Sequence, residues 1–93
     1  MATFKEIKHT LIKEGIMSSS EVKAIEIIAK IRALRFKENM SQSELSRRSG
    51  IPQKTISRME SGLSYPSVPT LIRLVDTLGY EMDVNLVKKK ESK

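Results

Sequence analysis

Residues 41–62, with the sequence SQSELSRRSGIPQKTISRMESG, contain two short helical patterns joined by the turn Gly50-Ile51-Pro52. Ser41 stands three residues before Glu44, which is the capping-box spacing at the start of a helix. Gly50 is typical of a left-handed helix end, and Pro52 is expected in the first turn of the next helix, where its missing N–H costs nothing. Helices this short gain little stability from propensity alone, so they depend on packing or on a partner.

Similar start and stop residues divide the remainder of the chain. Thr3 and Ser18 each precede a glutamate by three residues, and Ser67 precedes an early proline. We therefore expect five helices, over residues 3–14, 18–37, 41–49, 52–61 and 67–78. The helix 18–37 is apolar on more than one side, so we expect it to pack on two sides. Asn39 is expected to close this helix in a left-handed conformation.

The segment 80–86 has a different period. Apolar and polar residues alternate strictly there, which is the pattern of a half-buried β-strand. The apolar face consists of Tyr80, Met82, Val84 and Leu86. A lone strand cannot satisfy its own backbone groups, so it either folds back on its own domain or pairs with a second copy. We favour the second arrangement, a two-stranded ribbon at the two-fold axis of a homodimer.

The formal net charge of +6 on 93 residues points to a polyanionic partner, most simply nucleic acid. A plainer alternative is that three of these charges, on Lys88, Lys89 and Lys90, belong to a solvated tail. The chain has no cysteine, which excludes disulfides and cysteine metal sites and fits the cytoplasm, where we expect the protein. No apolar run approaches the roughly 20 residues of a membrane span, and none resembles a signal peptide.

Residues that carry enzyme chemistry do not occur in a catalytic pattern. The sequence shows no nucleophile–base constellation, no paired carboxylates and no glycine-rich phosphate loop, and each of the four glycines is explained as a helix end. His9 is the single histidine and has no second ligand candidate at metal spacing, so we interpret it as a surface residue. The sequence therefore predicts a protein that is not an enzyme and needs no metal or cofactor.

Residues 41–49 and 52–61, two helices joined by a tight turn, have the layout of a helix-turn-helix. The apolar positions that would hold both helices on a common core are Leu45, Ile51, Ile56 and Met59. The outer face of the second helix is then free, and the major groove of DNA admits an α-helix. Gln53 can pair with adenine edges, and Lys54 or Arg58 with guanine. The alternative is an ordinary solvated helix face.

The same stretch resembles the helix-turn-helix of the Cro/phage-repressor, or Xre-like, family. The matching features are Gln42 after a capping serine, Leu45, Gly50, Ile56 and the ending Glu60-Ser61-Gly62, and the similarity covers roughly residues 27–79. The resemblance implies an all-α, lambda-repressor-like domain of five helices, followed here by the short C-terminal β-strand for dimerisation. Pro52 departs from the family pattern, because many relatives have a capping serine or threonine there.

The resemblance also implies roles for individual side chains. Arg35 would pair with Glu60 and clamp the long helix to the recognition helix. Gln42 would touch a phosphate, and the exposed side chains of the second helix would face base edges. We assign contact with DNA to Gln42, Arg47, Arg48, Gln53, Lys54, Thr55, Ser57 and Arg58. Arg47 and Arg48 could equally be plain surface charge.

As a whole, the chain resembles HigA-type antitoxins of bacterial type II toxin–antitoxin modules. Those proteins are about this size and have an Xre-like domain, N-terminal helical residues and a short C-terminal tail like the ending GYEMDVNLVKK. The resemblance implies repression of the protein's own operon and neutralisation of a RelE-like (HigB-type) ribonuclease toxin. Alternatives are a free-standing Xre-like regulator without a toxin and an interaction adaptor whose charge is incidental.

We therefore expect four regions. They are an N-terminal helix over 1–17, the DNA-binding domain over 18–79, a dimerisation strand over 80–87 and a basic tail over 88–93. The first region either caps the core or binds the cognate toxin through Phe4, Ile7 and Leu11. A two-fold dimer would place two recognition helices roughly 34 Å apart, which predicts a pseudo-palindromic operator in double-stranded DNA.

Overall fold

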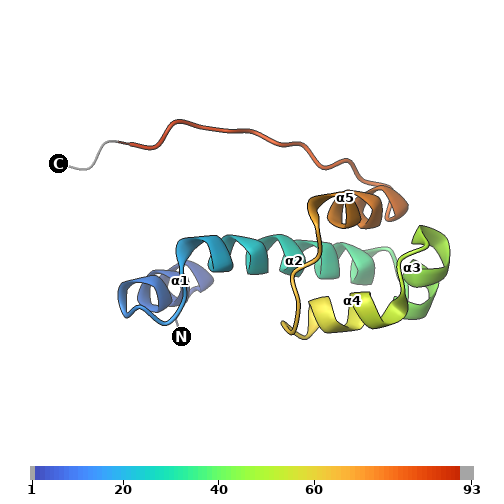
Figure 1. Cartoon of the computed structure of the whole chain (residues 1–93), viewed down its shortest axis with the longest axis horizontal. Helices are drawn as coiled ribbons and strands as arrows, with labels where there is room; N and C mark the ends of the chain where they lie inside the picture. The colour runs from blue at the N-terminus through green and yellow to red at the C-terminus, as the bar shows by residue number, and fades with distance from the viewer. Residues whose placement is uncertain (1, 91–93) are drawn as a thin grey trace.

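The computed structural model describes residues 2–90 of the chain. Five α-helices follow one another: α1 (Phe4–Lys13), α2 (Ser19–Lys37), α3 (Gln42–Ser49), α4 (Gln53–Glu60) and α5 (Val68–Thr77). α2 is the central rod: α3, α4 and α5 gather around its C-terminal half, and α1 folds back beside its N-terminal end (Figure 1). The prediction of five helices is confirmed within these residues.

The predicted start residues explain where most helices begin. The hydroxyl oxygens of Thr3, Ser18, Ser41 and Ser67 each accept a hydrogen bond from the backbone N–H three residues later. Asn39, with a φ of 54°, and Gly50, with a φ of 76°, are left-handed as expected. Pro52 is a correction, because it lies before α4 as its N-cap residue (ψ 138°) rather than inside the first turn. Its ring carries no hydroxyl, so α4 begins without a side-chain cap.

One hydrophobic core holds α2, α3, α4 and α5 together. Its fully buried side chains are Ile31, Leu45, Ile56, Met59 and Leu74, and Ile51 in the turn is 8% exposed. These include all four apolar positions that were predicted to hold the two short helices. Because Ile56 and Met59 of α4 must pack in this core, the opposite face of α4 points to solvent.

α1 contributes no buried residue to this core. Phe4 and Ile7 are 55% and 47% exposed, and Leu11 is half-buried. A salt bridge of 2.7 Å between Lys8 and Glu26 fastens α1 to α2. The apolar face of α1 is thus largely open. Within residues 2–90, no helix combines the length and the apolar character needed to cross a membrane.

Residues 80–90 form an extended tail that leaves α5 and projects beyond the helices (Figure 1). The predicted strand over 80–86 is not supported, because the described part of the chain contains no β-strand. Tyr80 and Met82 pack against the core, whereas Val84 and Leu86 are 65% and 94% exposed. The physical reason is that a strand requires a neighbour, and the single chain offers none to this segment. Residues 91–93 of the predicted basic tail, and Met1, lie outside the described residues.

Candidate nucleic-acid interface

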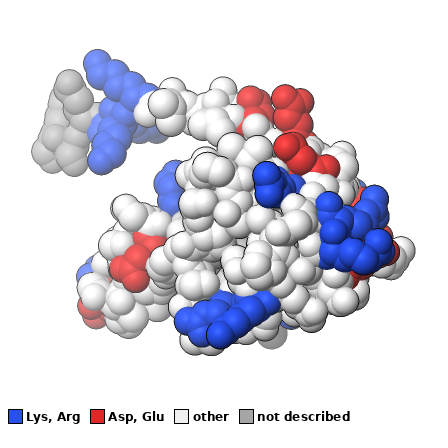
Figure 2. All heavy atoms as spheres, turned by 45° about the vertical axis from the view of Figure 1, so that its right-hand side comes forward, with Lys and Arg blue, Asp and Glu red and all other residues white. Residues whose placement is uncertain are grey.

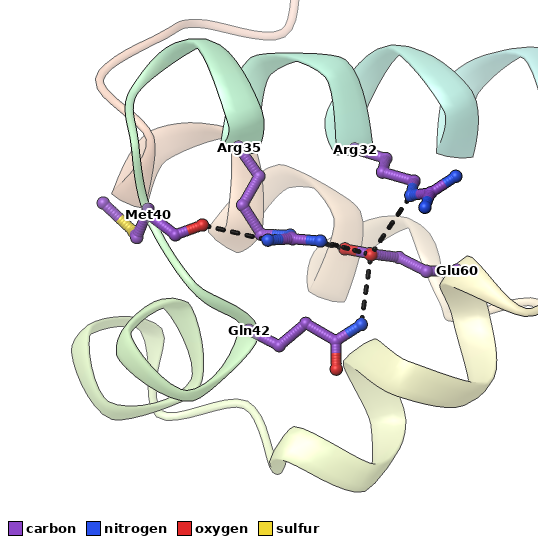
Figure 3. A network of polar contacts seen from close by, with 5 residues as sticks. All are labelled: Arg32, Arg35, Met40, Gln42 and Glu60. Carbon is purple, nitrogen blue, oxygen red and sulfur yellow. Dashed lines mark hydrogen bonds and ion pairs between the residues drawn. The ribbon is translucent and has the colours of Figure 1, made fainter.

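The carboxylate of Glu60, at the end of α4, is the centre of a buried polar network (Figure 3). Arg35 donates from Nε to Oε2 at 2.8 Å and from Nη2 to Oε1 at 2.7 Å, so its guanidinium binds both oxygens. Its Nη1 donates to the carbonyl oxygen of Met40 at 2.9 Å. Gln42 Nε2 donates to Oε1 at 3.1 Å, and Arg32 Nε lies 3.6 Å from the same oxygen. One carboxylate therefore connects α2, α3 and α4.

Burial and charge decide the protonation state of this pair. The side chains of Arg35 and Glu60 are 8% and 5% exposed. Burial alone would raise the pKa of Glu60, but the hydrogen bonds from Arg35 and Gln42 and the charges of Arg35 and Arg32 outweigh it, so this pKa lies below its ordinary value. The hydrogen bond to Glu60 raises the pKa of Arg35. The pair stays ionised and holds the end of α4 against α2.

The outer face of α4 presents polar side chains to solvent. Gln53, Lys54 and Arg58 are exposed, and Ser57 is half-buried between them. Lys54 and Arg58 are four residues apart, so they lie above one another on the same side of the helix. α4 thus carries two long cationic donors and one amide on a face that points to solvent and does not pack against the core.

The first turn of α4 is open as well. Thr55 is half-buried, and its backbone N–H donates to the carbonyl oxygen of Pro52 at 3.0 Å. The backbone N–H groups of Gln53 and Lys54 have no hydrogen-bond partner within residues 2–90. They remain available to an external acceptor, such as a phosphate or a base edge.

The three predicted contacts on α3 have different surroundings. Gln42 is half-buried, and its amide is held by Glu60 rather than free. Arg47 is 73% exposed and lies 3.8 Å from Glu44, which makes a weak surface pair. Arg48 is exposed. Contact of these three side chains with phosphate stays a prediction.

On the face of the molecule that Figure 2 shows, basic side chains do not form one continuous patch. Figure 2 shows separate groups of Lys and Arg on the visible face with uncharged surface between them, and a further group on the projecting tail. The case for a nucleic-acid interface therefore rests on the open face of α4 and not on a continuous basic surface.

Sequence reasoning missed three members of the Glu60 network: Arg32, the carbonyl group of Met40, and Gln42, whose amide was assigned to a phosphate. Arg32 lies three residues before Arg35 on the same side of α2, so helical spacing could have shown that both reach one partner. A backbone acceptor such as the carbonyl of Met40 leaves no trace in side-chain patterns. Within residues 2–90, no three His, Asp or Glu side chains gather as ligands for a metal ion.

Comparison with known proteins extends these observations. A family model described as helix-turn-helix matches residues 31–85, more than half of the chain. The chain belongs to the helix-turn-helix family. This is a family of DNA-binding regulators rather than of enzymes. The helix-turn-helix match begins within α2, so it covers the Glu60 network and the open face of α4 but not α1.

Among solved structures, this helix-turn-helix protein is similar to a chain of a toxin–antitoxin module from Streptococcus pneumoniae. The sequence identity is 27%, the TM-score is 0.65, and the match covers 94% of this chain and 96% of that one. The part of this chain outside the match is shorter than α1, which has 10 residues, so the match includes at least part of α1. The similarity therefore reaches beyond the helix-turn-helix domain into the N-terminal helix. No curated protein matches the sequence.

Proposed function

We propose that this protein is a transcriptional repressor that binds operator DNA through α4 and is also the antitoxin of a toxin–antitoxin pair. The observation that carries the proposal is the open polar face of α4, which the buried Glu60 network holds in place in a helix-turn-helix domain. A recognition helix must be rigidly oriented to select bases, and a buried bidentate pair provides this orientation.

The side chains of α4 divide the reading of the major groove among them. Lys54 and Arg58 donate to guanine, and Gln53 pairs with adenine, because their donor and acceptor patterns fit those edges. Ser57 is short enough to allow close approach, and Thr55 lies at the flank of the same surface. Contacts to phosphate from α3 would position the domain: Gln42, Arg47 and Arg48.

The antitoxin role is supported by the similarity to a chain of a toxin–antitoxin module, which reaches into α1. α1 has an open apolar face and no share in the core, which is what a partner-binding helix requires. We assign toxin contact to Phe4, Ile7 and Leu11. The partner would be a RelE-like (HigB-type) ribonuclease, and a free-standing Xre-type regulator without a toxin is the second candidate.

The DNA-bound form in this proposal is a homodimer in the cytoplasm. Residues 80–87 pair with the same segment of a second copy, and the apolar face of Tyr80, Met82, Val84 and Leu86 is covered in the process. Two α4 helices related by a two-fold axis then fit a pseudo-palindromic operator.

Two measurements test this function. Mass spectrometry of what co-purifies with the chain at native expression should find a stoichiometric small protein. A gel shift with the DNA upstream of its own gene should give a specific complex. A gel shift without a co-purifying partner would mean that the protein is a free-standing regulator. A stoichiometric partner protein without any gel shift, at low or high salt, would support an interaction adaptor and contradict the repressor function.

A further inference from the structure

An apolar hollow lies between the C-terminal tail and α2. It has a volume of about 410 Å³, and its lining includes Ile27, Ile31 and Leu34 of α2 and Met82 and Val84 of the tail. Ile27 is 40% exposed and Val84 is 65% exposed, so this surface is only partly covered within one chain. It has room for further apolar side chains.

The tail beyond the hollow is unpaired. Leu86 and Val87 are 94% and 86% exposed. Within residues 2–90, the backbone of residues 81–90 makes no backbone hydrogen bond, and the last one before it joins the N–H of Tyr80 to the carbonyl of Val75 at 3.1 Å. An extended segment with free backbone groups and one apolar face is a template for pairing with another strand.

We propose that the hollow is filled by the tail of a second copy, which pairs antiparallel with the first about a two-fold axis at Val84. This inference rests on the homodimer proposed above and names the contact that forms it. In this register Val84 faces its own counterpart, and Met82 of each copy stands opposite Leu86 of the other. Leu86 then enters the hollow beside Ile27, while Glu81 lies diagonal to Lys89.

The neighbouring registers are less favourable. A slip by one residue turns the apolar set of one strand away from α2 and toward solvent. An axis at Asp83 sets two carboxylates directly opposite each other, which is destabilising. An axis at Asn85 sets Met82 opposite Lys88, so a charged group would enter the apolar surface. The axis at Val84 keeps Val84, Met82 and Leu86 in apolar pairs, places Lys88 only at the end of the ribbon, opposite Tyr80, and sets no like charges directly opposite each other.

The chain has no cysteine, so single cysteine variants report this register directly. Asp83→Cys, Val84→Cys and Asn85→Cys are oxidised gently and separated on a denaturing gel without reductant. The counterparts of Val84 stand directly opposite, whereas those of the other two positions are about 7–8 Å apart. We expect Val84→Cys to form the covalent dimer at least about tenfold faster. Faster cross-linking at either neighbour, or none at all three positions, would overturn the proposal.

A second pair of variants tests the hollow. Leu86 and Val87 are both highly exposed in the single chain, so neither Leu86→Asn nor Val87→Asn should lower the stability of the monomer. We expect Leu86→Asn to raise the dimer dissociation constant at least about 100-fold in analytical ultracentrifugation, because two leucines are lost from the interface. Val87→Asn adds no charge opposite Glu81 of the second copy and should change the dissociation constant by less than about threefold. Equal effects of the two substitutions would overturn the proposal.

Failure of this inference can be told from failure of the proposed function. If the wild-type protein shifts operator DNA but Val84→Cys does not cross-link, repression stands and the dimer uses another surface. If Val84→Cys cross-links as expected but no DNA is bound, the tail pairing stands and the repressor function falls.

Discussion

At the residue scale, Glu60 joins three helices through one carboxylate, and this makes it the most sensitive position of the domain outside the apolar core. We expect Glu60→Gln to lower the free energy of unfolding at pH 7 by about 3–5 kcal/mol, because Arg35 is left as a buried, uncompensated charge. Urea unfolding measures this. The control is Glu44→Gln, whose pair with Arg47 is exposed and should cost less than about 1 kcal/mol. A similar loss in both variants would contradict the central role of Glu60.

The pH dependence of stability follows from the same residue. The pKa of Glu60 is lower in the folded chain than its ordinary value of about 4.5. Its contribution to stability is therefore fully present above that value and is lost as the pH falls through the lowered pKa. We expect the difference in free energy of unfolding between wild type and Glu60→Gln to shrink as the pH is lowered from about 6 to about 3, because carboxyl groups titrate in this range. A constant difference, measured by urea unfolding at each pH, would mean that folding does not change the pKa of Glu60.

Arg58 tests the recognition surface without touching the fold, because its side chain is exposed. We expect Arg58→Ala to weaken binding to the cognate operator by about 1–3 kcal/mol and to relax the preference for one base pair. Fluorescence anisotropy with operator and mutated operators measures both. Lys23→Ala, which removes the same charge from the exposed start of α2, is the matched control. If Arg58→Ala binds the operator with wild-type affinity, Arg58 does not contact the bases.

At the element scale, the sequence predicted the helices well because their ends are marked locally. A capping Ser or Thr and a left-handed Asn or Gly need no knowledge of the rest of the fold. The position of Pro52 was wrong by one step, since proline fits both the first turn and the residue before it. The predicted strand over 80–86 is not supported, because a period of two defines the faces of a segment but not the neighbour that supplies its hydrogen bonds. Arg32 in the Glu60 network depends on the tertiary approach of α2 and α4.

α1 is the element whose role is tested most directly by mutation. Phe4 and Ile7 are exposed and outside the core, so Phe4→Ser with Ile7→Ser should leave the melting temperature and DNA binding nearly unchanged. The same change should weaken toxin binding by about tenfold or more, because each side chain buries apolar area in the proposed contact. Isothermal titration calorimetry with the co-purified partner measures this. Lys5→Ser, an exposed position on the same helix, is the control. Unchanged affinity of the double variant would return α1 to a structural role.

At the scale of the whole molecule, the question is which charges meet the DNA. Lys88, Lys89 and Lys90 account for three positive charges, against a net charge of +6. They lie on the tail, which leaves α5 and projects on the side of α2 away from α4 (Figure 1). Net charge alone would therefore overstate the part of the protein that binds DNA.

The salt dependence of operator binding separates these charges. Each phosphate contact contributes about 0.9 to the slope of log affinity against log salt concentration. Replacing all three tail lysines by serine should change this slope by less than about 1 per protomer, whereas Arg47→Ala or Arg48→Ala, at the proposed phosphate contacts, should each reduce it by about 0.9 per protomer. Gel shifts between roughly 50 and 200 mM salt give the slope. A drop of about three per protomer in the serine variant would place the tail on the DNA, and the tail could then not be free to pair with a second copy over its whole length.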